Sequence, residues 1–346
     1  MITVTPLTSN SLSHRALHIA SAIRSGDIVA ADRSGKGTLI EAGSGTLTPL
    51  QLPAPEGVAI HPDGTFLALA TEEALLLLDR RTGAVRSSAM GKFDDCHFTP
   101  GGDLLWASRR PSEAEAVLEI RALANWEILA SAAMGDPFGR SAFVLSPGAD
   151  PSSISVWVAA GQDGQLIYWA SHQGGKISVA PFDRLSFTVP PSFSPGGDSF
   201  VVIANYSELH HYSHPGDHRH IAMPWPFEDE NDQIGDSVAF AGDRHALLQS
   251  NEGHLYLVEL ARGVVVERVV IAGHEPRPAS EIYPSLKSEH RPYTDLCYFR
   301  SLGAGMFLSV HHRDAPSVFD WTSELLTWRL DPADVLPVQE QQSLAL

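Results

Sequence analysis

The sequence PEGVAIHPDGTFLALATEEALLLLDRRTGAVRSSAM, at residues 55–90, contains a complete structural unit. Four short apolar segments, at 58–61, 66–70, 75–78 and 84–88, are separated by polar or turn-forming residues. Pro62-Asp63-Gly64 divides the first two segments, and Thr82-Gly83 precedes the last. Apolar runs divided by Pro, Asp and Gly are typical of strands joined by tight turns. The stretch therefore predicts a four-stranded antiparallel meander, the sheet of one β-propeller blade.

The first turn of this unit recurs along the chain, each time after an apolar segment. Besides residues 58–64, clear copies occur at 96–103, 143–150 and 192–198, weaker ones at 238–243 and 297–305, and a degenerate one at 18–27. These seven units are spaced roughly 40 to 60 residues apart, close to the propeller-repeat range. One such sheet cannot bury both faces alone, so the repeats should stack around an axis. We expect an all-β fold, a seven-bladed β-propeller, as one domain over residues 1–336.

Copies of the third strand support the same register. They are expected at 75–79, 117–121, 166–169, 209–212, 255–259 and 318–321, each followed by a turn and a fourth apolar segment. In the last unit the fourth segment would be SELLTWRL, at residues 323–330. Ile2 to Pro6 is a candidate for an additional outer strand. Residues 337–346 are expected to form a flexible C-terminal tail.

The repeated pattern, an apolar strand followed by F-S-P-G-G-D, with LLLLDRRTG closing the third strand, resembles the WD-repeat and bacterial WD-like propeller superfamily over nearly the whole chain. The resemblance departs from the typical repeat because no unit combines a Gly-His opening with a terminal Trp-Asp. Divergent members are therefore the better match. The resemblance implies a seven-bladed scaffold for protein–protein interaction, and it implies no catalytic residues.

Composition limits the partners of the protein. The 346 residues include 24 basic and 41 acidic side chains, for a net charge of −17. This acidic protein should repel phosphate backbones, and no basic patch with interleaved aromatics offers a nucleic-acid site. No apolar run is long enough for a membrane span, and the N-terminal residues do not resemble a secretory signal. The two cysteines make a disulfide framework unexpected, which favours a cytoplasmic location.

Four carboxylates occupy one equivalent position when the units are aligned on their first turn. They are Glu56, Asp94, Asp236 and Asp295, and the first unit has His18 at this position. In a propeller, the position directly before the innermost strand should surround one mouth of the central channel. Such a group of carboxylates would attract a basic segment of a partner or a divalent cation such as Ca²⁺. The alternative is that these carboxylates are solvated turn residues, with no cofactor at all.

PEGVAIHPDG also resembles the strand–turn motif of gluconolactonase-type metal-dependent propellers, in which a glutamate before the first strand belongs to the metal site. Glu56 matches that glutamate. The resemblance implies a metal-dependent lactone hydrolase as an alternative function, with the metal at the channel mouth on Glu56 and Asp236. Two departures stand against it, because that group has six blades and the sequence lacks a clear Asn-Asp ligand motif.

Two long insertions break the repeat, at Pro224–Asp236 and Gly273–Thr294. Loops of this length in a compact repeat are usually functional or disordered, and both should lie on one face. Trp225, within the acidic first insertion, is a candidate anchor for a partner. His311, His312 and Arg313 are expected in a loop between a second and a third strand on the same face. They are candidates for partner contact or simply polar surface residues.

The segment HHYSHPGDHRH, residues 210–220, contains five histidines. Histidine-rich segments bind Zn²⁺ or Ni²⁺ in some proteins, whereas a solvated hairpin is the alternative interpretation here. Cys96 and Cys297 are expected to be unbridged core residues on different blades. No nucleophile can be assigned from sequence motifs. The sequence therefore favours a non-enzymatic platform that binds a protein partner.

Overall fold

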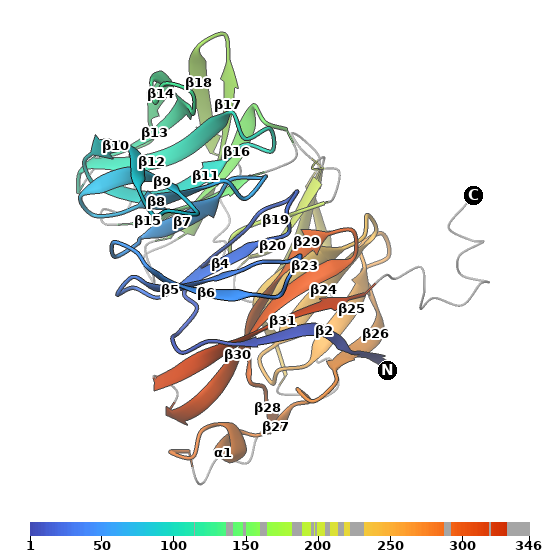
Figure 1. Ribbon diagram of the computed structural model, residues 1–346. Helices are drawn as coiled ribbons and strands as arrows, with labels where there is room; N and C mark the ends of the chain where they lie inside the picture. The colour runs from blue at the N-terminus through green and yellow to red at the C-terminus, as the bar shows by residue number, and fades with distance from the viewer. Residues whose placement is uncertain are drawn as a thin grey trace. The chain divides into compact units, whose positions relative to one another are not determined.

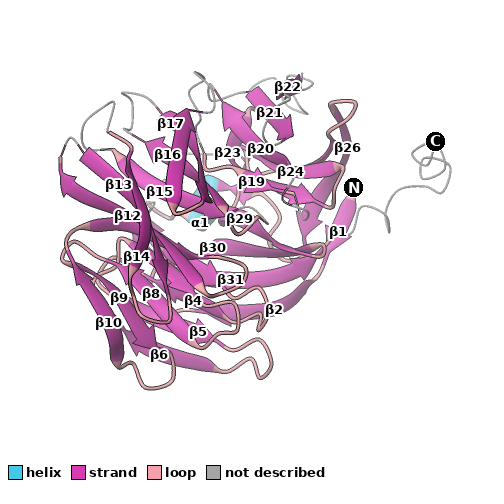
Figure 2. Ribbon diagram, turned by 90° about the horizontal axis from the view of Figure 1, so that it is seen from above, coloured by secondary structure: helices cyan, strands magenta, loops and turns pink. Residues whose placement is uncertain are grey.

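A computed structural model describes residues 1–113, 115–135, 141–147, 150–159, 165–181, 189–194, 197, 199–204, 208–213, 218–221, 232–286, 292–317 and 320–330. At positions 147, 165, 218, 236, 292 and 293 only the backbone is described. The chain folds as two compact units, one of His14–Pro190 and one of Met1–Ser13 with Pro191–Leu346. Each unit is described by itself. Nearly all regular structure in the described residues is β-strand (Figures 1 and 2).

The unit of His14–Pro190 contains four antiparallel sheets of four strands each. The first two sheets are β3 (His18–Ser21), β4 (Ile28–Ala31), β5 (Lys36–Ile40) and β6 (Leu47–Gln51), then β7 (Gly57–Ile60), β8 (Phe66–Ala70), β9 (Ala74–Asp79) and β10 (Val85–Met90). The next two are β11 (Phe93–Phe98), β12 (Leu104–Ser112), β13 (Glu115–Ala122) and β14 (Ile128–Ala133), then β15 (Ala142–Pro147), β16 (Ser153–Ala159), β17 (Gln165–Gln173) and β18 (Lys176–Pro181).

The second unit contains two sheets of four strands, one sheet of five strands and a docked insertion. The sheets are β19 (Ser192–Phe193), β20 (Ser199–Ala204), β21 (Glu208–Ser213) and β22 (His218–Ile221); β23 (Ile234–Ala241), β24 (His245–Ser250), β25 (Leu255–Glu259) and β26 (Val264–Ile271) with β1 (Ile2–Val4); and β29 (Leu296–Gly303), β30 (Met306–Ser317) and β31 (Asp320–Arg329) with β2 (Pro6–Ser11). The insertion forms β27 (Arg277–Pro278), α1 (Ala279–Ile282) and β28 (Pro292–Tyr293). Seven meander sheets confirm the predicted blade number and strand count.

The meander of residues 55–90 forms as its sequence predicts. Gly64 closes the first turn at φ +72°, a backbone conformation that glycine adopts without steric cost. Its amide donates to the carbonyl of His61 at 2.7 Å, and the His61 amide donates to the carbonyl of Phe66 at 2.9 Å. The inner strands β7 and β8 are almost wholly buried, whereas β10 at the outer edge is mostly exposed. Burial thus falls from the first strand to the fourth.

Neighbouring sheets within each unit pack face to face around apolar cores. Between β7–β10 and β11–β14 the core includes Leu75, Phe93 and Leu105, each fully buried. In the other unit, Phe307 and Trp328 stack with ring centroids 4.6 Å apart. Burial of such side chains contributes about 1.5–3 kcal/mol each, so these cores fix the sheets within a unit. Within the described residues, no helix has the length and apolar character needed to cross a membrane.

The seventh sheet differs from the prediction. SELLTWRL is not a fourth strand, because it belongs to the third strand β31, which pairs with β30 along most of its length. The fourth position is filled by β2 from the N-terminal end of the chain, with Asn10 opposite Leu325. The sequence PLTSNS of β2 is polar because an outermost strand needs only backbone pairing. The predicted outer strand at Ile2 to Pro6 is confirmed as β1, which pairs in parallel with β26.

The prediction of one domain over residues 1–336 stays a prediction. The proposed tail at 337–346 lies outside the described residues. Both cysteines are free thiols, as expected, with Cys96 buried in the sheet core and Cys297 partly buried.

Candidate functional site

The second insertion is a docked element rather than a loose loop. After β26 it turns back, pairs Arg277 in β27 with Tyr293 in β28, and forms the single helical turn α1. Ala279, Ile282 and Tyr283 are buried, so one side of the insertion packs against the protein. Figure 1 shows α1, β27 and β28 beside the long hairpin of β30 and β31. The insertion therefore presents a fixed surface.

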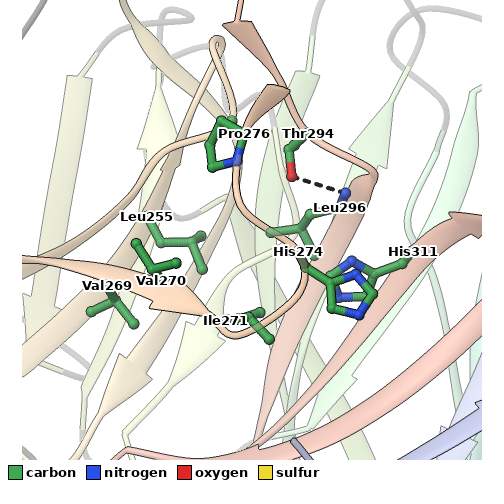
Figure 3. A pocket seen from close by; sticks show the side chains of 10 residues that line it. Leu255, Val269, Val270, Ile271, His274, Pro276, Thr294, Leu296 and His311 are labelled. Carbon is green, nitrogen blue, oxygen red and sulfur yellow. Dashed lines mark hydrogen bonds between the residues drawn. The ribbon is translucent and has the colours of Figure 1, made fainter. Parts of the chain in front are cut away.

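Asp295 anchors the beginning of this insertion through two histidines. Its carboxylate oxygens lie 2.8 Å from His274 Nδ1 and 3.0 Å from His311 Nδ1. The two imidazole rings are 4.3 Å apart between centroids. Figure 3 shows the His274 and His311 side chains lying together. His274 belongs to the insertion, Asp295 directly precedes β29, and His311 lies in β30. The cluster thus joins the insertion to the inner strands of the seventh sheet.

A buried chain of hydrogen bonds determines the proton positions in this cluster. The indole nitrogen of Trp328, which can only donate, bonds to Ser309 Oγ at 3.0 Å. The Asp295 carboxylate can only accept, so the proton of a neutral His311 lies on Nδ1, and the Ser309 hydroxyl donates to the unprotonated Nε2 at 2.8 Å. Burial lowers the pKa of His311 despite the neighbouring Asp295 carboxylate. We infer that His311 is neutral here.

The other two members of the cluster, Asp295 and His274, carry opposite charges when both are ionised. Burial would raise the pKa of Asp295, but hydrogen bonds from His274 and His311 outweigh it and hold the pKa below its usual range. Burial would lower the pKa of His274, but the hydrogen bond and charge of Asp295 outweigh it and raise the pKa. Below about pH 6.5, the Asp295 carboxylate and the His274 imidazolium therefore form a largely buried ion pair. Such a pair fixes geometry more reliably than it adds net stability.

Ser309, His311 and Asp295 have the hydrogen-bond order of a nucleophilic triad. The side chains of Ser309 and His311 are, however, completely buried, and Ser309 accepts the indole proton of Trp328. A substrate carbonyl could not reach the Ser309 hydroxyl. The arrangement is therefore a structural network, and no catalytic role follows from it.

A second anchor holds the helical turn of the insertion. The hydroxyl of buried Tyr283 lies 2.6 Å from His312 Nε2 in β30. The His312 ring also contacts Trp321 of β31 edge to face, with centroids 4.2 Å apart. Tyr283, which directly follows α1, therefore has both apolar and polar contacts with the hairpin. The two anchors fix opposite ends of residues 274–283.

The pocket of Figure 3 lies between the insertion and the neighbouring sheet. Its lining includes His274, His311, Thr294 and Leu255. The volume is about 10 Å³, the space that a single water molecule needs. Gly253 closes one side at φ +85°, and a Cβ there would stand 2.5 Å from the Thr294 Cβ. This pocket is too small for an organic substrate.

His311, His312 and Arg313 are not in a loop, which corrects the prediction. All three lie within β30, which pairs with β31 without a break from Met306 to Arg313, the residue opposite Thr322. The strand continues beyond its apolar core, and its polar end has the composition of a loop although it is paired as a strand. His311 is buried and His312 partly buried, while Arg313 is exposed and bonds to Ser11 Oγ. The insertion brings the first two into contact with His274 and Tyr283.

The predicted carboxylates have different environments. Glu56 is exposed, directly before β7. Asp94 forms an ion pair with Arg110, whose Nη2 lies 2.8 Å from Oδ2, with both side chains mostly buried. Asp295 is buried between its two histidines. Charge neutralisation of Asp94 and Asp295 would therefore disturb the structure as well as any binding.

The remaining predicted residues are only partly described. The backbone of Asp236 lies in β23, but its side chain is outside the described residues, as is Trp225. His18 opens β3 and is partly buried. Burial and then the Arg33 charge lower the pKa of His18, which favours the neutral imidazole. The binding roles assigned to these residues stay predictions.

Asp95, which directly follows the predicted Asp94, is a functional candidate that the sequence patterns do not single out. Its two oxygens accept the backbone amides of Cys96 and Leu145, each at 2.8 Å, so it joins β11 to β15 of the next sheet. Burial raises the pKa of Asp95 to about 7, although the two amides act against this rise. Gly57 faces it closely, since a Cβ there would lie 2.3 Å from Oδ1. A lone carboxylate followed by cysteine carries no motif that could have revealed this role.

The described residues include three groups in which three His, Asp or Glu ligand atoms lie within 4.8 Å of one another. Neither Glu56 nor Asp94 belongs to any of these groups. Asp94 already faces a guanidinium group, which opposes cation binding. The side chain of Asp236 is outside the described residues, so the predicted Ca²⁺ or lactonase metal site stays a prediction, and no reaction step is derived from it.

The exposed side of the insertion and the adjoining hairpin end carry charged residues. We call this the insertion surface: Glu275, Arg277 and Glu281 from the insertion, with Arg313, Asp314 and Asp320 from the hairpin. These described residues thus comprise four carboxylates and two guanidinium groups. Asp314 has φ +46°, directly after the last paired residue before a bulge, and its side chain is 81% exposed. Counted over the residues that the structure describes, the insertion surface is net acidic, and the two anchors hold its insertion part in place.

Comparison with known proteins supports the fold. Among solved structures, the chain is similar to the β-propeller domain of Cps50 (Swd1) from Myceliophteria thermophila. The TM-score is 0.61 at 10% sequence identity, over 93% of this chain and 100% of that domain. No family model matches, and no curated protein matches. Together with the seven meander sheets, this likeness identifies the fold as a seven-bladed β-propeller, as predicted.

Proposed function

We propose that the protein is a non-enzymatic interaction platform that binds a basic segment of a protein partner on the insertion surface. The observation that carries the proposal is the double anchoring of the insertion. His274 pairs with buried Asp295 at one end, and Tyr283 bonds to His312 at the other. Loops positioned by a rigid β scaffold are where such proteins commonly bind. A surface ordered in advance loses less entropy when a partner binds.

The charge of the surface indicates the class of partner. Glu275, Glu281, Asp314 and Asp320 are exposed, and the whole chain carries a net charge of −17. A net acidic surface on an acidic protein accelerates encounter with a basic segment and disfavours acidic ones. Prolines 278 and 284, both exposed, stiffen the same stretch of backbone. We therefore expect a lysine- or arginine-rich segment as the bound element.

The test begins with affinity capture from the native host and mass spectrometry, followed by titration of a synthetic peptide covering the basic segment of the captured partner. The variant Glu275→Lys/Glu281→Lys reverses two charges on the insertion surface. Glu115→Lys/Glu127→Lys makes the same change in total charge on an exposed part of the β11–β14 sheet. We expect the first pair to weaken binding about tenfold or more, because like charges then face each other, and the control to change it far less.

Glu56 provides the competing location for the same partner, at the channel mouth predicted from the sequence. It is exposed, so Glu56→Lys should leave the sheet intact. A loss of affinity with Glu56→Lys alone would place the partner at the mouth and overturn the assignment to the insertion surface. Equal losses from the insertion pair and the control pair would show that only total charge matters, which would also overturn it.

A further inference from the structure

We propose that Glu208, His210 and His220 form a binding site for a zinc-class divalent metal ion at the edge of the β19–β22 sheet. The three residues come from β21 and β22, the third and fourth strands of that sheet, which lie side by side in Figure 2. Their ligand atoms all lie within 4.8 Å of one another. This inference is independent of the partner-binding role proposed above.

The geometry follows from strand pairing. His210 stands directly opposite His220 in the antiparallel ladder, and Glu208 precedes His210 by two residues, so all three share one face. The two imidazole rings are 5.0 Å apart between centroids and tilted by 31°. The Glu208 carboxylate oxygen Oε2 lies 2.9 Å from His210 Nε2. Two imidazoles and a carboxylate therefore converge without any loop rearrangement.

The burial of the three ligands differs in a way that suits metal uptake. The His210 side chain is only 3% exposed, which fixes its ring, and the Glu208 side chain is 37% exposed. His220 is exposed on the edge strand β22. An ion can therefore approach from solvent while one ligand is already held in place. The earlier alternative of a solvated hairpin does not describe His210, which is buried.

The donor set indicates which metals fit. Two imidazole nitrogens with one carboxylate oxygen suit Zn²⁺, Co²⁺ and Ni²⁺ better than Ca²⁺, which prefers oxygen donors. Tetrahedral Zn²⁺ with bonds of about 2.0–2.1 Å needs ligand atoms about 3.4 Å apart. The 2.9 Å contact between Glu208 and His210 would open slightly, and exposed His220 would move inward. The open side leaves the fourth position to water.

The other two candidate clusters are less suitable. In His274–Asp295–His311, both Asp295 oxygens are already bonded to imidazole nitrogens inside the protein. In Asp232–Glu252–His254, the guanidinium of Arg268 lies 2.6 Å from His254 Nδ1, and a cation there would meet this fixed positive charge. The site on β21 and β22 has a solvent path, which makes it the most favourable of the three.

The experiment is a Co²⁺ titration of the full-length protein after chelator treatment, followed by displacement with Zn²⁺. The wild type should bind one equivalent of Co²⁺ with the absorption of a low-coordinate complex. His220→Ala should weaken the affinity about tenfold or more, since even indirect partners of a metal site contribute 10–100-fold. Glu208→Gln provides a second ligand variant that keeps the shape of the side chain. Arg219→Ala is the matched control, because Arg219 is exposed on the same strand and is not one of the three ligands.

The results separate the alternatives. Loss of binding in both ligand variants, with Arg219→Ala unchanged and circular dichroism matching the wild type, supports the site. Absence of a saturable equivalent in the wild type overturns the proposal. Undiminished binding in both His220→Ala and Glu208→Gln overturns it too, because the metal is then held elsewhere. If only one of the two ligand variants folds, the Co²⁺ affinity of that variant alone determines whether the proposal holds.

Discussion

The substitution Asp295→Asn should destabilise the protein by about 2–4 kcal/mol. Asp295 accepts two hydrogen bonds, from His274 Nδ1 at 2.8 Å and His311 Nδ1 at 3.0 Å, and its side chain is only 9% exposed. Hydrogen bonds to a charged group contribute about 1.5–3 kcal/mol each, and removal of one partner from a buried ion pair costs about 3–5 kcal/mol. Asparagine keeps the shape and one acceptor oxygen, so the loss should be near the lower end.

The variant lacks the charge that keeps His274 protonated. Its amide oxygen can still accept from His311 Nδ1, but its NH₂ group then faces His274 Nδ1, which must lose its proton to accept. The ion pair with His274 is therefore lost, and both remaining hydrogen bonds have an uncharged acceptor. This explains why a nearly isosteric substitution should have a large effect.

Urea unfolding followed by tryptophan fluorescence measures this difference, because Trp328 belongs to the network. Asp320→Asn is the control, since Asp320 is an exposed acid on the adjoining hairpin and should change stability by less than about 0.5 kcal/mol. The pKa of Asp295 is depressed, so its stabilisation is present above about pH 4 and lost as pH falls toward the folded value. An Asp295→Asn protein within about 0.5 kcal/mol of the wild type at pH 7 would refute the proposed network.

Three further outcomes are expected from the same region. Tyr283→Phe, which loses the hydroxyl contact with β30, should cost about 1–2 kcal/mol and speed amide exchange across the insertion; unchanged exchange would contradict the second anchor. Gly253→Ala should destabilise strongly, because its Cβ would stand 2.5 Å from the Thr294 Cβ at φ +85°, and an unchanged melting temperature would disprove that packing. Since the pKa of His274 is raised, its stabilisation is complete below about pH 6.5 and is lost as pH rises through the folded value. The stability difference between wild type and His274→Gln should shrink over that interval, and in an Asp295→Asn background this pH dependence should disappear.

The repeated first turn was sufficient to predict most of the fold. Pro, Asp and Gly between apolar segments favour a tight turn, and the spacing of the clear copies located the weaker ones, so all seven first strands lie where expected. The exception was the outer strand of the last sheet. Backbone pairing and side-chain hydrogen bonds, such as the one between Thr8 and Thr327, hold β2 in place. Its polar sequence has no apolar periodicity, whereas the apolar pattern of SELLTWRL predicts a strand of its own.

The candidate site was only partly predictable. Alignment of the repeats singled out Asp295, but its partners are separated from it by 21 residues on one side and 16 on the other. His274 reaches it only because the insertion folds back, which no repeat pattern encodes. His311 was noticed as part of a polar stretch, yet its burial depends on β30 continuing beyond the expected turn. Contacts created by an insertion are specific to this chain and cannot be inferred from its repeats.

Site-specific photo-crosslinking tests the proposed function most directly. A photoreactive residue at Ser285, exposed in the insertion and uncharged, would report any molecule that lies on the insertion surface. The same residue at Glu127, exposed in the β11–β14 sheet, is the matched control. We predict that Ser285 captures the basic segment of the partner and that Glu127 does not. Capture at Glu127 with none at Ser285 would contradict the assignment of the insertion surface.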